Sequence, residues 1–183
     1  NGKVIVSGAT GGVGSLAIDI LAGLGYTVVA LTGKADQRNY LEGLGAAEVM
    51  PRAALDSARM RPLDKALWAG AVDSLGGDVL AWMASTMQQN GTIASVGLAA
   101  TASLQTTVMP FILRGVSLLG VDSAYTAMPL RRRVWERLAR DMRPPHLVEL
   151  TRTIPFAELP SAFEPFIAGA AHGRTVVSIH PEN

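Results

Sequence analysis

The stretch Val4-Ile5-Val6-Ser7-Gly8-Ala9-Thr10-Gly11-Gly12-Val13-Gly14 decides the fold of this chain. An apolar run of strand-forming residues changes abruptly into glycines, and helical spacing of apolar residues follows. A pyrophosphate needs backbone N–H groups and a helix N-terminus directed at it, and only glycine lets the main chain turn so tightly and come so close. Gly11 is the expected close-approach glycine and Gly14 the one that packs helix on strand, while Ala9 stands where the fingerprint's first glycine usually is. The stretch predicts a phosphate cradle.

Two other nucleotide-binding motifs are excluded by the residues that would have to accompany them. Ser7-Gly8-x-x-x-Gly12-x-Gly14 has the spacing of the short-chain dehydrogenase turn, but that family needs Tyr-x-x-x-Lys, and no tyrosine here is followed four places on by lysine. A P-loop needs Gly-Lys-Ser/Thr at the start of a helix, and Gly33-Lys34 is followed by Ala35. A glycine-rich turn alone is also compatible with an ordinary turn or helix cap.

Composition narrows the class of protein. With 183 residues, of which 49% are hydrophobic, the chain can form one domain with a sizeable core, or one domain and a remnant of another. A net charge of +1 gives no reason to expect nucleic acid or a membrane as partner. The absence of cysteine excludes disulfides and is compatible with the cytoplasm. No apolar run is long enough to cross a bilayer, so we expect a soluble, cytoplasmic protein. Because Asn1-Gly2-Lys3 leads directly into a strand, we expect a piece of a longer protein.

Strand-like and helical segments alternate along the chain. The expected strands are short apolar runs near 4–7, 27–31, 47–50, 67–74, 91–97 and 115–121, and the expected helices cover about 13–24, 36–44, 76–87, 106–114 and 129–142, with a loop at 51–62. Such an alternation of continuous apolar strands with helices predicts an α/β fold, a doubly wound six-stranded parallel sheet of the Rossmann type covered on both faces. Ligands bind such sheets beyond the carboxyl ends of the strands.

The helix expected at 129–142 carries an unusual number of cations. Five arginines, Arg131, Arg132, Arg133, Arg137 and Arg140, alternate with apolar residues at helical spacing. This pattern favours the solvated face of an amphipathic helix over a phosphate-binding patch.

Several further motifs, taken together, resemble one family. They are Leu-x-x-Leu-Gly-Ala-Ala-Glu-Val at 41–49, Val-Asp-Ser-Leu-Gly-Gly at 72–77, Thr-Thr-Val-Met-Pro-Phe-Ile-Leu-Arg-Gly-Val-Ser-Leu-Leu-Gly-Val-Asp-Ser at 106–123, Ile-Pro-Phe-Ala-Glu-Leu-Pro at 154–160 and His-Gly-Arg-Thr-Val-Val at 172–177. With the glycine turn they resemble the acrylyl-CoA reductase branch of the medium-chain dehydrogenase/reductase superfamily, which is often labelled quinone oxidoreductase. The resemblance covers nearly the whole chain.

The resemblance implies a domain organisation and a reaction. Residues 1–145 would form the NADP-binding Rossmann domain, and residues 146–183 a tail that completes a GroES-like substrate domain absent from this chain. The parent enzyme would transfer a hydride from NADPH to a short α,β-unsaturated acyl-CoA, or to a quinone-like acceptor, without zinc. The three histidines, His146, His172 and His180, lack ligand-like spacing and are interpreted as surface or tail residues. The strand expected at 175–179 would have its pairing partners in the absent domain.

The resemblance also implies which residues contact the cofactor. Thr10, Gly11, Gly12 and Val13 would lie at the pyrophosphate, Thr32, Gly33 and Lys34 at the adenosine ribose, and Leu98, Ile112 and Ser123 nearer the nicotinamide. Ile112 is equally compatible with a place in the core, and Ser123 with a turn. Asp73 is compatible with capping the helix that begins near Gly76 rather than touching cofactor.

The second strand indicates which cofactor is preferred. NAD-binding folds place an acidic residue about 20 residues past the glycines, where it binds the ribose 2′-OH and repels a 2′-phosphate. Here Thr32, Gly33 and Lys34 occupy the end of that strand, with Arg38 one helical turn further. A hydroxyl, a backbone N–H and cations suit a phosphate dianion, so the sequence predicts NADPH.

The sequence leaves two alternative functions open and predicts how the protein assembles. A Rossmann domain without a catalytic partner is also compatible with a non-catalytic NADP(H)-sensing module, and a second alternative is an enoyl-reductase segment of a synthase. The sixth strand carries apolar side chains on both faces at what should be a sheet edge, so we expect a homodimer joined there.

Overall fold

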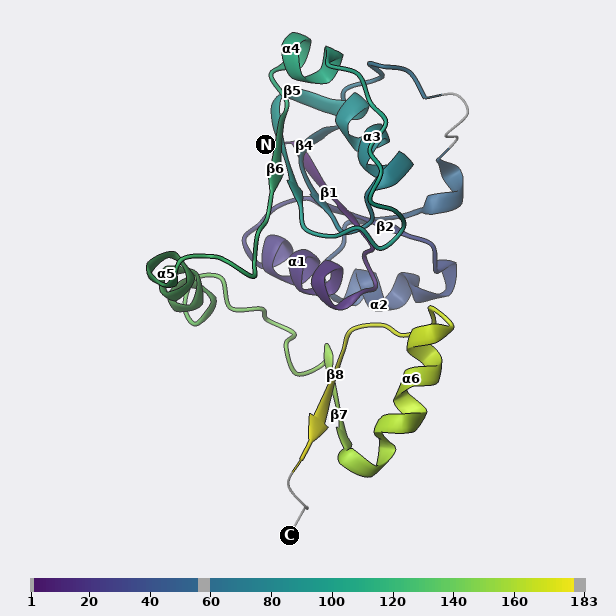
Figure 1. Cartoon of the computed structure of the whole chain (residues 1–183), viewed down its shortest axis with the longest axis vertical. Helices are drawn as coiled ribbons and strands as arrows, with labels where there is room; N and C mark the ends of the chain where they lie inside the picture. Colours follow the sequence, from purple (N-terminus) through teal and green to yellow (C-terminus); the bar gives the residue numbers. More distant parts are fainter. Residues whose placement is uncertain (1, 56–59, 180–183) are drawn as a thin grey trace.

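The computed structural model describes residues 2–55 and 60–179, and its centre is a six-stranded parallel sheet (Figure 1). The strands lie in the order β3-β2-β1-β4-β5-β6. Their bounds are β1 Lys3–Ser7, β2 Val28–Thr32, β3 Glu48–Pro51, β4 Trp68–Asp73, β5 Met87–Ser95 and β6 Ser117–Gly120. The helices are α1 Gly12–Gly23, α2 Arg38–Gly43, α3 Gly77–Thr86, α4 Met109–Arg114, α5 Met128–Leu138 and α6 Leu159–Ile167. This order is that of a doubly wound Rossmann sheet, which confirms the predicted fold class.

Alternating side chains of the central strands build a core on each face of the sheet. Ile5 and Leu31 are fully buried on the face that α3 covers, where they pack with Met83. Val6 is fully buried on the opposite face, where it packs with Ile18 of α1 and with α2. Because both faces are covered, each central strand reads as a continuous apolar run, as the sequence suggested.

The strand order creates a crevice above the middle of the sheet. From β1 the chain winds outward through β2 to β3, then returns to β4 on the other side of β1. The loops that follow β1 and β4 therefore leave in opposite directions, and a ligand can enter between them. The glycine turn of residues 8–11 follows β1 directly at this point.

Some element boundaries differ from the sequence prediction. β5 begins at Met87, four residues before the expected strand, and Asn90 adopts a left-handed φ of 57° ahead of the regular part. α5 ends at Leu138, so its last expected turn is not helical. Within the expected loop at 51–62, Arg52–Ala54 forms one 3-10 turn, and 56–59 fall outside the described residues. No helix in the portion described is both long and apolar enough to cross a membrane.

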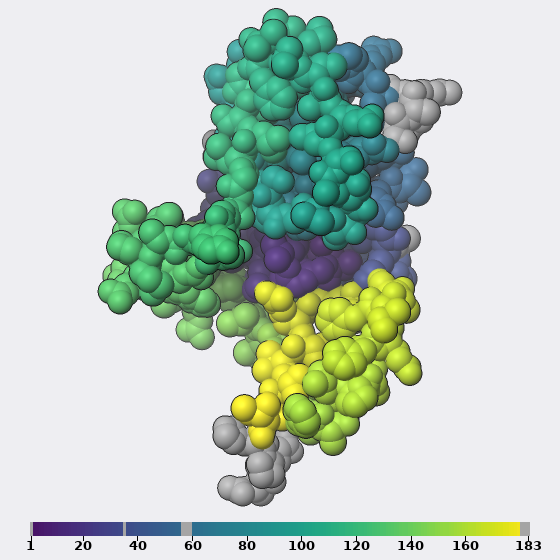
Figure 2. All heavy atoms as spheres, viewed as in Figure 1, coloured from purple at the N-terminus to yellow at the C-terminus, as the bar shows by residue number. Residues whose placement is uncertain are grey.

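The basic helix α5 extends away from the sheet, as the green projection in Figures 1 and 2 shows. None of its residues is buried, and Arg137 pairs with Asp141 at 2.6 Å. The arginines are solvated, as expected, with Arg131 donating to the carbonyl of Ser123 at 2.7 Å. The apolar side is also uncovered, since the side chain of Trp135 is 65% exposed.

The tail forms a small unit of its own below the carboxyl ends of the sheet (Figures 1 and 2). β7 Thr151–Pro155 pairs in parallel with β8 Arg174–Ser178, and α6 connects them. The strand expected at 175–179 therefore has a partner within this chain, which corrects the expectation that its partners all lie elsewhere. The sequence analysis overlooked β7, a short run of threonines with Ile154 whose strand propensity is high.

Candidate nucleotide-binding site

The glycine turn after β1 has the close contacts that only glycine permits. Gly8 adopts a left-handed φ of 59°, and the Gly11 N–H donates to its carbonyl at 2.9 Å. A Cβ on Gly14 would lie 2.3 Å from the Gly8 oxygen and 2.9 Å from the Ala9 Cα, so α1 can rest on the turn only because Gly14 lacks a side chain. The first N–H groups of α1, beginning at Gly12, have no carbonyl within the helix to bind. They form an anion-binding end directed into the crevice.

A buried carboxylate fixes the second turn of the crevice, after β4. Asp73 is fully buried, and its Oδ1 accepts from the Ser7 hydroxyl at 2.6 Å and from the Leu75 N–H at 3.2 Å. Its Oδ2 accepts from the Gly76 N–H at 2.9 Å. Ser7 in turn accepts from the Ser74 N–H at 3.0 Å, which ties the two turns together. The carboxylate of Asp73 thus holds the turn that precedes α3, while Gly76, the N-cap residue of α3, provides no side-chain cap.

A cleft of about 280 Å³ opens between the glycine turn and the end of β2. It is lined by Gly8, Thr10, Leu31, Thr32, Gly33, Lys34, Arg52, Leu75 and Gly169. Thr32 is buried, and its hydroxyl accepts from the Lys34 N–H at 3.0 Å, which shapes the loop around the exposed Gly33. Four of the predicted cofactor residues, Thr10, Thr32, Gly33 and Lys34, thus meet at one cleft, beside Gly11, Gly12 and Val13 at the start of α1.

Three cations lie around this cleft, and two of them were missed by the sequence analysis. Lys34 was predicted, whereas Arg52 lies with its guanidinium 3.6 Å from where a Cβ of Gly33 would be. The side chain of Arg174 lies over the start of α1, since a Cβ on Gly12 would be 2.8 Å from its Cδ. Neither could be found from a local pattern, because Arg52 follows β3 and Arg174 lies on β8.

Arg38, by contrast, is engaged elsewhere. Its guanidinium pairs with Glu42 at 3.1 Å and donates to the Val49 carbonyl at 3.1 Å, on the side of α2 that faces β3. Of these two arginines, Arg52 lines the cleft and Arg38 does not.

The residues predicted nearer the nicotinamide are dispersed. Leu98 follows β5 and lies close to the second turn, because a Cβ on Gly76 would be 3.8 Å from its Cα. Ser123 follows β6 at the same end of the sheet. Ile112 lies on α4, whose Arg114 donates to the carbonyls of Ser85 and Met87 at the amino-terminal end of the sheet. Ile112 is therefore at the opposite end from the glycine turn, and its side chain is 71% exposed rather than in the core.

A segment of the tail crosses the open side of the cleft, and we call Gly169–Arg174 the strap. The Gly173 N–H donates to the Thr10 carbonyl at 3.0 Å. The ammonium of Lys34 donates to the carbonyl of Ala171. The strap thus makes the tail part of the wall of the cleft.

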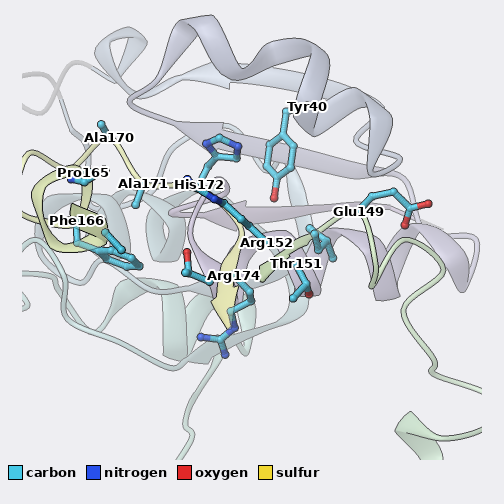
Figure 3. A pocket seen from close by; sticks show the side chains of 13 residues that line it. Tyr40, Glu149, Thr151, Arg152, Pro165, Phe166, Ala170, Ala171, His172 and Arg174 are labelled. Atoms are coloured by element: carbon cyan, nitrogen blue, oxygen red, sulfur yellow. The ribbon is translucent and has the colours of Figure 1, made fainter. Parts of the chain in front are cut away.

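Behind the strap lies a second cavity of about 340 Å³, shown in Figure 3. His172 packs against Tyr40 with ring centroids 5.1 Å apart, and the Tyr40 hydroxyl donates to Ser15 at 2.9 Å. Burial raises the pKa of the Tyr40 phenol, so it keeps its proton at neutral pH. Arg152 and Phe166 line the same cavity (Figure 3).

The histidines are more structured than predicted. His146 contacts buried Asp19 of α1 twice, through its backbone N–H at 2.9 Å and with its Nδ1 2.8 Å from Oδ1. It therefore anchors the chain to α1 where the tail begins, and its side chain stays 44% exposed, in keeping with a surface or tail residue. His172 belongs to the strap, and His180 lies outside the described residues. Within 2–55 and 60–179, no cluster of three or more possible ligands is placed to hold a metal ion.

A third cavity, of about 430 Å³, shares Arg52 with the cleft. Its wall is mostly apolar and includes Leu55, Val79 and Trp82, together with the glycines that begin α3. Because Arg52 lines both, this apolar cavity lies next to the cationic cleft.

Strand order, glycine turn and cationic cleft together define a Rossmann-type nucleotide-binding domain. Comparison with known proteins identifies it further: the model of the zinc-binding dehydrogenase family matches residues 12–140, and the chain belongs to this family. The resemblance to the acrylyl-CoA reductase branch of the medium-chain superfamily is likewise confirmed by individual relatives.

Acrylyl-CoA reductase AcuI of Ruegeria pomeroyi is 43% identical over 98% of this chain and 54% of its own length. The crystal structure of YhdH from Escherichia coli with bound NADPH superposes with a TM-score of 0.91 at 43% identity, over 98% of this chain and 55% of that one. YhfP of Bacillus subtilis, solved with NAD, gives 0.92 at 42% identity, over 97% and 54%. The chain thus spans about half the length of these relatives.

Proposed function

We propose that this chain is the cofactor-binding portion of an NADPH-dependent oxidoreductase. The observation that carries the proposal is the cleft beyond β1 and β2, which combines Lys34 and Arg52 with the N-terminus of α1, where Arg174 lies; among the described residues, none that lines the cleft is a carboxylate. Such a site attracts phosphates and leaves a 2′-phosphate unopposed.

Each part of the dinucleotide can be assigned to a part of the cleft or of its surroundings. The pyrophosphate would bind the N–H groups at Gly12 and Val13 with Arg174 beside it, and the phosphorylated ribose would bind between Lys34 and Arg52. The adenine would enter the apolar cavity next to Arg52, where Val79 and Trp82 offer apolar contact. Leu98 and Ser123, at the carboxyl ends of β5 and β6, remain the proposed contacts on the nicotinamide side.

The preference for NADPH over NADH is tested by titrating both reduced cofactors and following their fluorescence. We expect tighter binding of NADPH, and a loss of that advantage in Lys34→Ala, because each charge-assisted hydrogen bond contributes about 1.5–3 kcal/mol. Relatives have been solved with NADPH and with NAD, so the comparison tests residues of this chain rather than the family. Equal affinities for the two cofactors would refute the preference.

For the reaction, we propose reduction of the C=C bond of a short α,β-unsaturated acyl-CoA, with a quinone-like acceptor as the alternative substrate. The names of the relatives support this substrate class. NADPH would supply the hydride, and this chain would bind and orient it, with residues 1–145 as the cofactor domain and 146–183 as a tail that completes a substrate domain.

This division of roles has a direct test. Hydride transfer needs the substrate carbon held about 3–3.5 Å from the nicotinamide, and such positioning supplies about 7–11 kcal/mol of the barrier. We therefore expect the 183-residue chain to bind NADPH but not to oxidise it measurably with acryloyl-CoA, while a longer parent protein does. Parent-like turnover by this chain would overturn the division, and a parent without turnover would favour a sensing module.

We also propose a cytoplasmic homodimer joined along β6. This strand forms an edge of the sheet, and Leu119 in it and Val121 just after it are about half exposed. An exposed apolar edge strand favours pairing with a second copy. Analytical ultracentrifugation at micromolar concentration should show a dimer that Leu119→Asp dissociates, and a wild-type monomer would refute the proposal.

A further inference from the structure

We propose that the strap Gly169–Arg174 is a specificity-determining element of the nucleotide site, because it holds the Lys34 ammonium where a phosphate on the adenosine ribose would bind. The inference rests on the proposed function, since it concerns the choice between NADPH and NADH. It assigns to the tail a part in cofactor selection in addition to any part in a substrate domain.

The contact that carries the inference joins residues 137 positions apart in sequence. The Lys34 ammonium, at the end of β2, donates to the Ala171 carbonyl in the strap. An ammonium group has three donors, so this bond leaves two for a ligand in the cleft. A free lysine side chain loses rotamer freedom when it binds a phosphate, and that loss weakens binding. By fixing the ammonium beforehand, the strap lowers this cost.

The strap can fix Lys34 because its own backbone is held at both ends. Ala170 and Ala171 donate their N–H groups to the Pro165 carbonyl at 2.8 and 3.1 Å. At the other end, the N–H of Gly173 donates to Thr10 as described, and that of Arg174 donates to the Leu150 carbonyl at 2.8 Å. The carbonyl of Ala171 therefore has a defined position over the cleft.

The conformation of the strap depends on Gly173. Its φ of +60° lies in the left-handed region, and an added Cβ would be 2.6 Å from the Leu150 oxygen and 3.2 Å from the Tyr40 hydroxyl. Gly173→Ala must therefore displace the strap, and with it the Ala171 carbonyl. Gly43 provides a matched control, because a Cβ there meets no atom within 4 Å and its φ is not left-handed.

The experiment measures the dissociation constants of NADPH and NADH by isothermal titration for the wild type, Gly173→Ala, Gly43→Ala and Lys34→Met. Selectivity is the ratio of the NADH constant to the NADPH constant. We expect Gly173→Ala to lower this ratio about tenfold, the equivalent of one charge-assisted hydrogen bond, and Gly43→Ala to leave it unchanged. In a Lys34→Met background, Gly173→Ala should not lower the ratio further, because the strap acts through Lys34.

The outcomes separate this inference from the proposed function. If Gly173→Ala weakens both cofactors equally, or still lowers the ratio in the Lys34→Met background, the strap does not select through Lys34. If the wild type binds neither cofactor, the proposed function fails and the inference with it.

Hydrogen exchange of the wild type gives a measurement that needs no variant. Saturating NADPH should slow exchange at the Gly173 and Arg174 amides more than saturating NADH does, and equal protection would overturn the inference.

Discussion

Replacing Asp73 tests whether one buried carboxylate organises both turns of the nucleotide crevice. In Asp73→Asn, the amide oxygen can still accept from the Gly76 N–H, and the Ser7 hydroxyl can turn to accept from the new NH₂ group. The Leu75 N–H, which now donates to Oδ1, then faces a second donor. One buried N–H is left without an acceptor, and that costs about 1–3 kcal/mol.

Asp73→Ala removes the acceptor entirely and should be the more damaging change. The N–H groups of Leu75 and Gly76 both lose their partner, and at about 1–3 kcal/mol each the sum is about 2–6 kcal/mol. The Ser7 hydroxyl loses its acceptor as well. The expected order of stability is therefore wild type, then Asp73→Asn, then Asp73→Ala.

Urea unfolding followed by circular dichroism measures these differences, with the free energy taken by linear extrapolation. Asp36→Asn is the control, because Asp36 is exposed and its hydrogen bond with the side-chain amide of Gln37 lies at the surface. The control should change stability by no more than about 0.5 kcal/mol. If Asp73→Ala is no more destabilising than this control, the tie between the two turns is not a significant source of stability and the reasoning is wrong.

Three further predictions test the site. Gly14→Ala should destabilise the chain by about 1–3 kcal/mol through its clash with the Gly8 carbonyl, whereas Gly43→Ala should be neutral or stabilising by up to about 1 kcal/mol, as thermal unfolding would show. Arg52→Ala should weaken NADPH binding about tenfold in titrations while Arg38→Ala changes it by less than about twofold, and the reverse order would contradict the assignment of the second cation. Asp19→Ala leaves the His146 backbone N–H without its acceptor and should lower the free energy of unfolding in urea by about 1–3 kcal/mol. His146→Ala keeps that hydrogen bond and should cost less. Equal losses in the two variants would show that the ring carries the contact.

The sheet could be predicted from the sequence because its signals are local. The central strands β1 and β2 are continuous apolar runs, and the alternation of strand-like segments with helices along the chain left one architecture. The glycine turn could be predicted for the same reason, since Gly14 is required by its contact with Gly8 and Ala9, which lie within six positions of it. The start of β5 was predicted less accurately, because the left-handed backbone conformation of Asn90 interrupts the regular strand.

The cations of the cleft could not be ranked from sequence, because their roles depend on distant partners. Arg38 and Arg52 both stand close to the end of β2 in the fold, and composition does not distinguish them. The difference is that Glu42, four residues after Arg38 on the same helix, pairs with that guanidinium. Spacing of this kind is visible in a sequence, since oppositely charged residues four apart on a helix attract each other. The spacing favours a pairing of Arg38 with Glu42 over a contact between Arg38 and a cofactor phosphate.

The tail shows the limit of prediction most clearly. The sequence of a single strand does not show which strand it pairs with. β8 pairs with β7 because α6 returns the chain beside it. That pairing fixes the start of β8, and so brings Arg174 against Gly12 and the strap across Lys34. Residues more than 130 positions apart thereby form one cleft wall. The proposed nucleotide site therefore depends on the tail, and we expect a truncation after residue 145 to lose cofactor affinity in NADPH titrations even if the six-stranded sheet still folds.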